Sequence, residues 1–112
     1  MKDYYSLFAE LSLQQCTKED YADKTKVKAG NAAHKKLKQL QDEMKQIDST
    51  EVLLALLSHE DDRVKLNAAF FCLQTDILVR QSVSVLKKII KKSDDPTIAF
   101  SAKTVLQGFG KI

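Results

Sequence analysis

The chain repeats part of its own sequence at a constant offset of 33 residues. Residues 52–73 (VLLALLSHEDDRVKLNAAFFCL) align without a gap on residues 85–106 (VLKKIIKKSDDPTIAFSAKTVL), and apolar positions fall mostly on apolar positions. The identical pairs are Val52/Val85, Leu53/Leu86, Asp61/Asp94, Asp62/Asp95, Ala69/Ala102 and Leu73/Leu106. Each copy reads as a helix, an acidic turn and a second helix, and repetition of such a unit is typical of an α-solenoid. Scaffolds of this kind usually hold another macromolecule.

The composition favours an all-α fold. Three glycines and a single proline, Pro96, occur in 112 residues, and sheet-rich folds need more turn residues than that. The net charge of +3 is a mild basic excess, and no segment reaches the ~18–20 apolar residues of a membrane span. The start, MKDYYSLFAEL, lacks the apolar core of a secretory signal, and Cys16 and Cys72 share no metal-binding or redox spacing. These features predict a reduced protein of the cytoplasm.

Periodicity and capping signals predict a single HEAT-like domain over residues 1–112, built as a short α-solenoid of about six helices. We expect residues 1–47 to supply N-terminal cap helices, because two repeats alone are too few to bury their faces. Residues 48–112 then hold the two helical repeats. The expected helices cover residues 3–15, 23–46, 51–57, 62–73 and 77–92, and a last helix runs from residue 96 to Gly108 or Gly110.

The spacing of apolar residues predicts which faces are buried. The second expected helix carries a seam with steps of three and four residues: Gly30, Ala33, Leu37, Leu40, Met44 and Ile47. The first helix should bury Tyr4, Phe8 and Leu11, with Leu7 beside them. The fourth helix is apolar on two sides, which predicts a central helix: Val64, Ala68 and Phe71 on one side, Leu66, Ala69, Phe70 and Leu73 on the other. Inward positions of the last two helices are Leu78, Ser82, Val85, Leu86, Ile89 and Ile90, then Ile98, Ala102, Val105, Leu106 and Phe109.

Aspartates in the two turns predict helix caps. Asp61 or Asp62 would cap the fourth helix, because a short acidic side chain can accept from the first unpaired backbone N–H groups. Asp94 or Asp95 would cap the sixth helix in the same way. Pro96 then occupies the first helical position, where a missing N–H costs nothing.

Residues with the chemistry for a metal or catalytic site do not form a recognisable site. His59 and Glu60 precede Asp61 and Asp62, but consecutive residues rarely converge on one ion, so helix capping is the better interpretation of this turn. Cys72 lies in the most apolar helix and is expected to be a small buried hydrophobe. No nucleophile and base have a testable spacing. We therefore expect no catalytic residue, no cofactor and no metal.

The turn and the helix after it carry a family resemblance. Val64-Lys65 and Ala68-Ala69 resemble the short variety of HEAT repeat, whose second helix follows an acidic turn with V-R or V-K and then small residues. The ankyrin and tetratricopeptide signatures are absent. Residues 1–106 are similar to a family of small bacterial helical domains of unknown function, and some of its members look like immunity proteins associated with secreted toxins. The resemblance implies partner binding and brings no catalytic residues.

Lysines form the remaining signal. Lys24, Lys26 and Lys28 precede another lysine group with no acid among them, and the expected fifth helix carries a second basic group. One interpretation is a solvated outer face; the other is that the groups converge and bind an anionic surface. The candidate partner-binding residues are Lys35, Lys36, Lys38, Arg80, Lys87, Lys88, Lys91 and Lys92.

Two functional hypotheses follow. The favoured hypothesis is a non-enzymatic protein-interaction module, in its most specific form a cytoplasmic immunity protein that binds and neutralises a cognate bacterial toxin with an acidic surface. The alternative is a nucleic-acid-binding helical solenoid that uses the same lysine-rich face. The lack of aromatic residues between the lysines counts against this alternative. Neither hypothesis involves a membrane.

Overall fold

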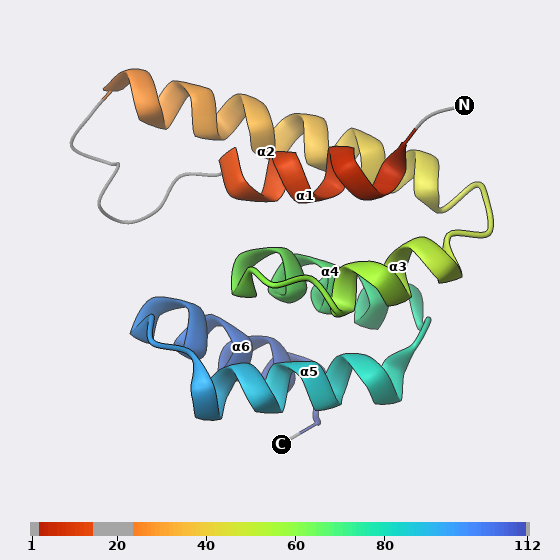
Figure 1. Ribbon diagram of the computed structural model, residues 1–112, viewed down its shortest axis with the longest axis vertical. Coiled ribbons are helices and arrows are strands. Elements are labelled where there is room, and N and C mark those ends of the chain that lie inside the picture. The colour runs from red at the N-terminus through yellow and green to blue at the C-terminus, as the bar shows by residue number, and fades with distance from the viewer. Residues whose placement is uncertain (1–2, 15–23, 112) are drawn as a thin grey trace. The chain divides into compact units, whose positions relative to one another are not determined.

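The computed structural model describes residues 3–14 and 24–111, with side chains described from residue 31 onward in the second range. In this part of the chain there are six helices and no strands: α1 (Tyr4–Gln14), α2 (Lys24–Met44), α3 (Thr50–Leu57), α4 (Asp62–Thr75), α5 (Val79–Lys92) and α6 (Pro96–Gly108) (Figure 1). The all-α prediction is confirmed, and the solenoid arrangement stays a prediction. The helices belong to two compact units, Met1–Ser49 and Thr50–Ile112.

In the first unit, α1 packs along α2. Asp3 caps α1, since its carboxylate accepts from the Ser6 N–H at 3.1 Å and from the Ser6 hydroxyl at 2.8 Å. Hydrogen bonds from Ser6 hold the pKa of Asp3 below its ordinary value of 3.8, and the bond from the Ser6 backbone N–H contributes more than that from its hydroxyl. The buried positions are Phe8, Ala9 and Ser12.

The prediction of which α1 residues are buried is therefore wrong in part. Phe8 is buried, but Tyr4, Leu7 and Leu11 are half-buried. The buried line runs through positions 8, 9 and 12, where Ala9 and Ser12 are small. Small side chains let a helix approach its neighbour closely, so the face with Ala9 and Ser12 packs against α2 and the larger apolar residues beside it are only half-buried.

The seam of α2 is confirmed where it lies inside the helix. Ala33, Leu37, Leu40 and Met44 are buried. Ile47 was also expected to be buried, but 46 % of it is exposed, because α2 ends at Met44 and the helical spacing no longer applies beyond that residue. The Ser49 hydroxyl donates to the Met44 carbonyl at 3.2 Å and so satisfies one of the unpaired carbonyls at the helix end. Cys16 lies outside the described part of the chain, and within α2 the burial of Gly30 and the side chains of Lys24, Lys26 and Lys28 are not described.

In the second unit, α4 packs against α3, α5 and α6, and it has more buried residues than the other helices of the unit. α5 also contacts all three other helices, whereas α6 packs against α4 and α5, so α4 shares its predicted central position with α5. The core of this unit consists of Leu53, Leu56, Leu57, Val64, Ala68, Ala69, Phe71, Cys72, Leu73, Leu86, Ile89, Ala102 and Leu106. Cys72 is fully buried, as expected for a small hydrophobe.

Some expected core positions lie at the margin of the second unit. Leu66 is half-buried and Phe70 is 38 % exposed. The Phe70 ring meets that of Phe109, itself 36 % exposed, edge to face at a centroid distance of 6.0 Å. On α5 and α6 the same holds for a further set of half-buried residues: Leu78, Val85, Ile90, Ile98 and Val105. The helical spacing predicted the direction of these side chains, while the depth of burial depends on how many neighbouring helices cover them.

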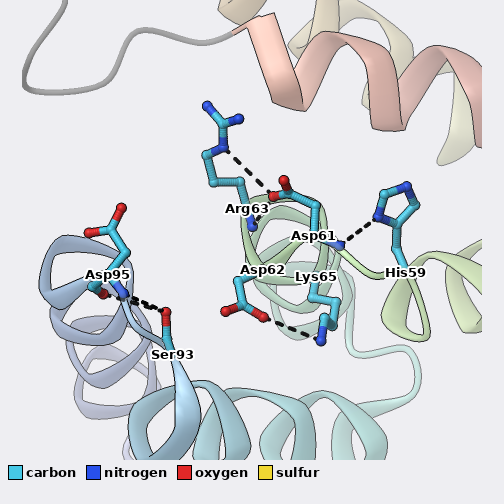
Figure 2. Close-up of polar contacts among 7 residues, drawn as sticks. All are labelled: His59, Asp61, Asp62, Arg63, Lys65, Ser93 and Asp95. Atoms are coloured by element: carbon cyan, nitrogen blue, oxygen red, sulfur yellow. Dashed lines mark hydrogen bonds and ion pairs between the residues drawn. The ribbon is translucent and has the colours of Figure 1, made fainter.

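The two acidic turns use different aspartates of the repeat. Asp61 caps α4, where its carboxylate accepts from the Arg63 N–H at 2.8 Å (Figure 2). In the second copy the cap is Asp95, which accepts from the N–H groups of Thr97 and Ile98. Asp61 aligns with Asp94 in the repeat, so the cap moves by one residue. Pro96 explains the shift, because a residue that precedes proline avoids the helical region and Asp95 is extended at φ −98° and ψ 108°.

The other two aspartates of the turns do not cap. Asp62 is the first residue of α4, and its carboxylate pairs with the Lys65 ammonium at 3.3 Å (Figure 2). Asp94 is exposed. Of the four aspartates offered as caps, Asp61 and Asp95 thus have this role.

Candidate binding surface on α5

Helix α5 separates apolar from basic residues along its whole length. Its sequence, VRQSVSVLKKIIKK, places Ser82, Leu86 and Ile89 in the core at the spacing of a helical face. The opposite face is exposed and carries every cation of the helix: Arg80, Lys87, Lys88, Lys91 and Lys92. No acidic residue occurs in α5. The structure therefore brings together the second of the two predicted basic groups.

Within this exposed face the cations border two different hollows. Arg80, Lys87 and Lys91 line an open groove of about 650 Å³ together with the half-buried Val83 and Ile90, and Ser84 also contributes. Lys88 and Lys92 line a second pocket, of about 390 Å³, between α5 and the α3–α4 turn. Lys88 borders both hollows. We refer below to the α5 groove and the α3–α5 pocket.

The charges on α5 are not neutralised within the described part of the molecule. None of its five cations forms an ion pair with a described residue. Lys87/Lys91 and Lys88/Lys92 are like-charged pairs one turn apart, and each such pair costs about 0.2–0.5 kcal/mol. Lys91 and Lys92 gain back some of this energy because they lie in the last turn, at the negative end of the helix dipole. Lys87 and Lys88 have no such compensation.

The other predicted basic group lies on α2, in the first unit. Lys35, Lys36 and Lys38 are exposed, away from the buried seam. The same helix ends with Asp42 and Glu43, and Asp42 pairs with Lys45 at 3.8 Å. The convergence of this group with α5 stays a prediction, because the two groups belong to different units.

The side chains of the acidic turn before α4 make hydrogen bonds within the turn and to the first turn of the helix. The His59 Nδ1 atom accepts from the Asp61 N–H at 3.0 Å, and Asp61 in turn caps the helix (Figure 2). Among the described residues, no three His, Cys, Asp or Glu side chains gather closely enough to hold a metal ion. The structure thus gives the turn a structural role.

The Cys72 thiol lies in the core beside Ser82. Burial raises the pKa of the thiol, and the neighbouring Ser82 hydroxyl opposes this in part. That hydroxyl makes no hydrogen bond of ordinary geometry to a described residue, so its contact with the sulfur is weak. A buried thiol with a raised pKa is mostly protonated and is a poor nucleophile.

The α3–α5 pocket was not predicted from the sequence. Its lining adds Ser58, Asp62, Lys65 and Ser93 to the predicted Lys88 and Lys92. Lys65 was read as part of a repeat signature and Asp62 as a cap. The only signal in the sequence is that neighbouring repeats stack, which brings the first helices of the two copies into the same layer without specifying which residues face one another.

Comparisons with known proteins add a family and no function. No helix in the described residues is both long and apolar enough to cross a bilayer. Neither a curated protein nor a solved structure matches the chain. A family model described as a domain of unknown function, DUF2019, matches residues 2–109. The predicted membership in a family of unknown function is therefore confirmed, and this chain belongs to the DUF2019 family.

Proposed function

We propose that this protein is a non-enzymatic binding module that holds an acidic partner protein against the exposed face of α5. The observation that carries the proposal is the concentration of five unneutralised cations on one face of a 14-residue helix. Surfaces of one sign steer a partner of the opposite sign and raise the rate of encounter. The like-charged pairs on α5 weaken the helix slightly, so a role outside the fold accounts for them better than stability does.

The α5 groove supplies the kind of surface that a protein partner needs. Val83 and Ile90 are half-buried beside Arg80, Lys87 and Lys91, so the groove offers an apolar strip with cations at its edge. Protein interfaces have this pattern, with an apolar centre and a charged rim. Proteins that bind single-stranded nucleic acids commonly stack the bases on aromatic side chains, and α5 has no aromatic residue.

In its most specific form the proposal is an immunity protein that binds a bacterial toxin and neutralises it by covering its active site. The support for this form is the resemblance of the repeat to short HEAT repeats, and the resemblance of the chain to a family of helical domains in which some members look like immunity proteins. Neutralisation by occlusion requires no catalytic residue in the binding protein. An acidic surface around the active site of the toxin would match the charge of α5.

Coexpression with toxin domains encoded in the same genomic neighbourhood tests the proposal. We expect one of them to arrest growth alone and to form a stable 1:1 complex with this protein when growth is rescued. Reversal of two groove charges, K87E/K91E, should slow association by at least about tenfold at low salt. The control K103E changes an exposed lysine of α6 and should leave association unchanged.

Two outcomes would overturn the proposal. The first is that no coexpressed domain forms a complex or is neutralised. The second is binding of a generic oligonucleotide with an affinity that falls linearly with salt on logarithmic axes and is lost in K87E/K91E. That result would assign the α5 face to nucleic acid.

A further inference from the structure

The α3–α5 pocket is a second hollow on the second unit, and the proposed protein partner does not explain it. Three elements form it: the end of α3 with Ser58, the first turn of α4 with Asp62 and Lys65, and the last turns of α5. Its floor is apolar, since Leu57 and Ile89 are 5 % and 3 % exposed. Its volume of about 390 Å³ lies within the range of pockets that hold small molecules.

The polar lining of the pocket has a net positive charge. Lys65, Lys88 and Lys92 contribute three ammonium groups, and Asp62 contributes the single carboxylate. The Asp62 and Lys65 side chains, which are 31 % and 26 % exposed, pair at 3.3 Å and lie toward α5 (Figure 2). Lys88 and Lys92 have no ion pair within the described residues. Two positive charges on neighbouring turns of one helix are thus left over beside an apolar floor.

We propose that the α3–α5 pocket binds a small phosphate monoester with a compact apolar body. A phosphate dianion would balance the charges of Lys88 and Lys92, and lysine is a common point-charge ligand of phosphate. The hydroxyls of Ser58 and Ser93 line the same pocket. They donate to the Leu54 and Asp95 carbonyls at 3.4 and 3.5 Å, and a phosphate oxygen would have to replace these long hydrogen bonds to engage them. Leu57, Val85 and Ile89 provide the apolar contact for the organic part. The assignment is independent of the proposed protein partner.

The charge of Asp62 makes the assignment testable in both directions. Asp62 opposes an incoming anion and engages Lys65. Removal of its charge should strengthen binding, while removal of the charges on Lys88 and Lys92 should weaken it. If the ligand bound elsewhere on the surface, the affinity would neither rise when the charge of Asp62 is removed nor fall when the charges of Lys88 and Lys92 are removed.

The experiment is a titration of the full chain with phenyl phosphate. Binding is measured by isothermal titration calorimetry and by the NMR chemical-shift changes of the backbone amides of Ser58, Lys65 and Ser93. We expect phenyl phosphate to bind at least about tenfold more tightly than inorganic phosphate or benzoate, since each lacks one of the two required parts. K88Q/K92Q should weaken phenyl phosphate at least about tenfold, and K103Q/K111Q, with the same loss of charge outside the pocket, should not. D62N should strengthen binding severalfold, whereas D94N should leave it unchanged.

Several results would overturn the assignment. They are absence of binding at about 10 mM phenyl phosphate, equal affinity for inorganic phosphate, equal losses in the two lysine double variants, or equal gains in D62N and D94N. Circular dichroism of each variant checks that the helices are retained. All substituted side chains are exposed or half-buried, so the fold should persist.

Discussion

The two copies of the repeat share their inner positions and differ in what surrounds them. Leu53 and Leu86 are both fully buried, and so are Ala69 and Ala102. The first copy ends in α4, which packs against three helices of its unit, whereas the second ends in α6, which packs against two. Because more helices pack against α4 than against α6, the two helices differ in the residue types along their faces.

One stripe of α4 changes its character completely in α6. Val64, Ala68 and Phe71 are buried, and the repeat aligns them with Thr97, Ser101 and Thr104. Thr97 and Thr104 are exposed, and the hydroxyls of Ser101 and Thr104 donate to carbonyls of their own helix. An apolar stripe stays apolar where a neighbouring helix covers it, and hydroxyl residues replace it where water does. The repeat thus preserves the fold within a copy and adapts each copy to its surroundings.

The first helices of the two copies differ in the same way. α3 has eight residues with Glu51 as its only charged residue, whereas α5 has 14 residues and five cations. Leu53 and Leu56 of α3 align with Leu86 and Ile89 of α5, and all four are buried. The outer face is free to change because it does not support the core. Both proposed binding surfaces use this freedom of α5.

The stripe comparison predicts the largest effect. Phe71→Ala should lower the free energy of unfolding by about 3–5 kcal/mol, because it leaves a cavity in the core. Thr104→Ala, at the aligned position of α6, should change it by less than about 0.5 kcal/mol. Denaturant unfolding followed by circular dichroism measures both values. Equal losses at the two positions would break the contrast between covered and uncovered stripes.

The identical positions should instead behave alike. Leu53→Ala and Leu86→Ala should each cost about 2–5 kcal/mol, because both side chains are fully buried. The two losses should agree within about 1 kcal/mol if the copies are packed equally well. The same unfolding experiment tests this, and a much smaller loss at Leu86 would show that the second copy packs more loosely than the first.

The shift of the cap by one residue predicts a smaller effect. Asp61→Ala and Asp95→Ala should each cost about 0.5–2 kcal/mol, since each removes an acceptor from the first turn of a helix. Asp94→Ala should cost less than about 0.5 kcal/mol, although Asp94 is the residue that aligns with Asp61. A larger loss for Asp94 than for Asp95 would place the cap where the alignment alone would put it.

The smallest effect concerns two buried serines, Ser49 and Ser82, which have the 33-residue spacing of the repeat but precede its two copies. Both are buried, but the Ser49 hydroxyl donates to the Met44 carbonyl while that of Ser82 makes no ordinary hydrogen bond to a described residue. Ser49→Ala should cost about 1 kcal/mol. Ser82→Ala should be neutral or stabilising by up to about 1 kcal/mol, because it removes an unsatisfied polar atom and improves helix propensity. Thermal unfolding distinguishes the two signs, and a clear loss in Ser82→Ala would reveal a partner for its hydroxyl.

Local signals predicted the helices well, and the errors fall where local signals end. Asp3 and Pro96 were expected at the start of their helices and are there. Ile47 was expected to be buried because the seam spacing was extended beyond the end of α2. Phe70 was expected to be buried because its helix is apolar on two sides, yet it lies at the margin of the core. A helix end and the number of covering neighbours are properties of the packed chain.

The binding surfaces show the same division. The five cations of α5 were identified from the sequence, and the helical period places them on one exposed face. Their separation into the α5 groove and the α3–α5 pocket was not predicted. The pocket joins Ser58, Lys65 and Lys92 from three elements, and no spacing along the chain relates these residues.

Three properties could be predicted from the amino-acid sequence alone: the chain is helical, one helix–turn–helix unit occurs twice, and α5 is basic on its outer side. These properties follow from apolar spacing and capping residues, which act over a few turns of chain. Which aspartates cap, which apolar residues are covered and that Lys65 and Lys88 line one pocket became evident from the packing of the helices. Such features depend on contacts between elements distant in the chain, and their energies are set by the neighbours that packing supplies.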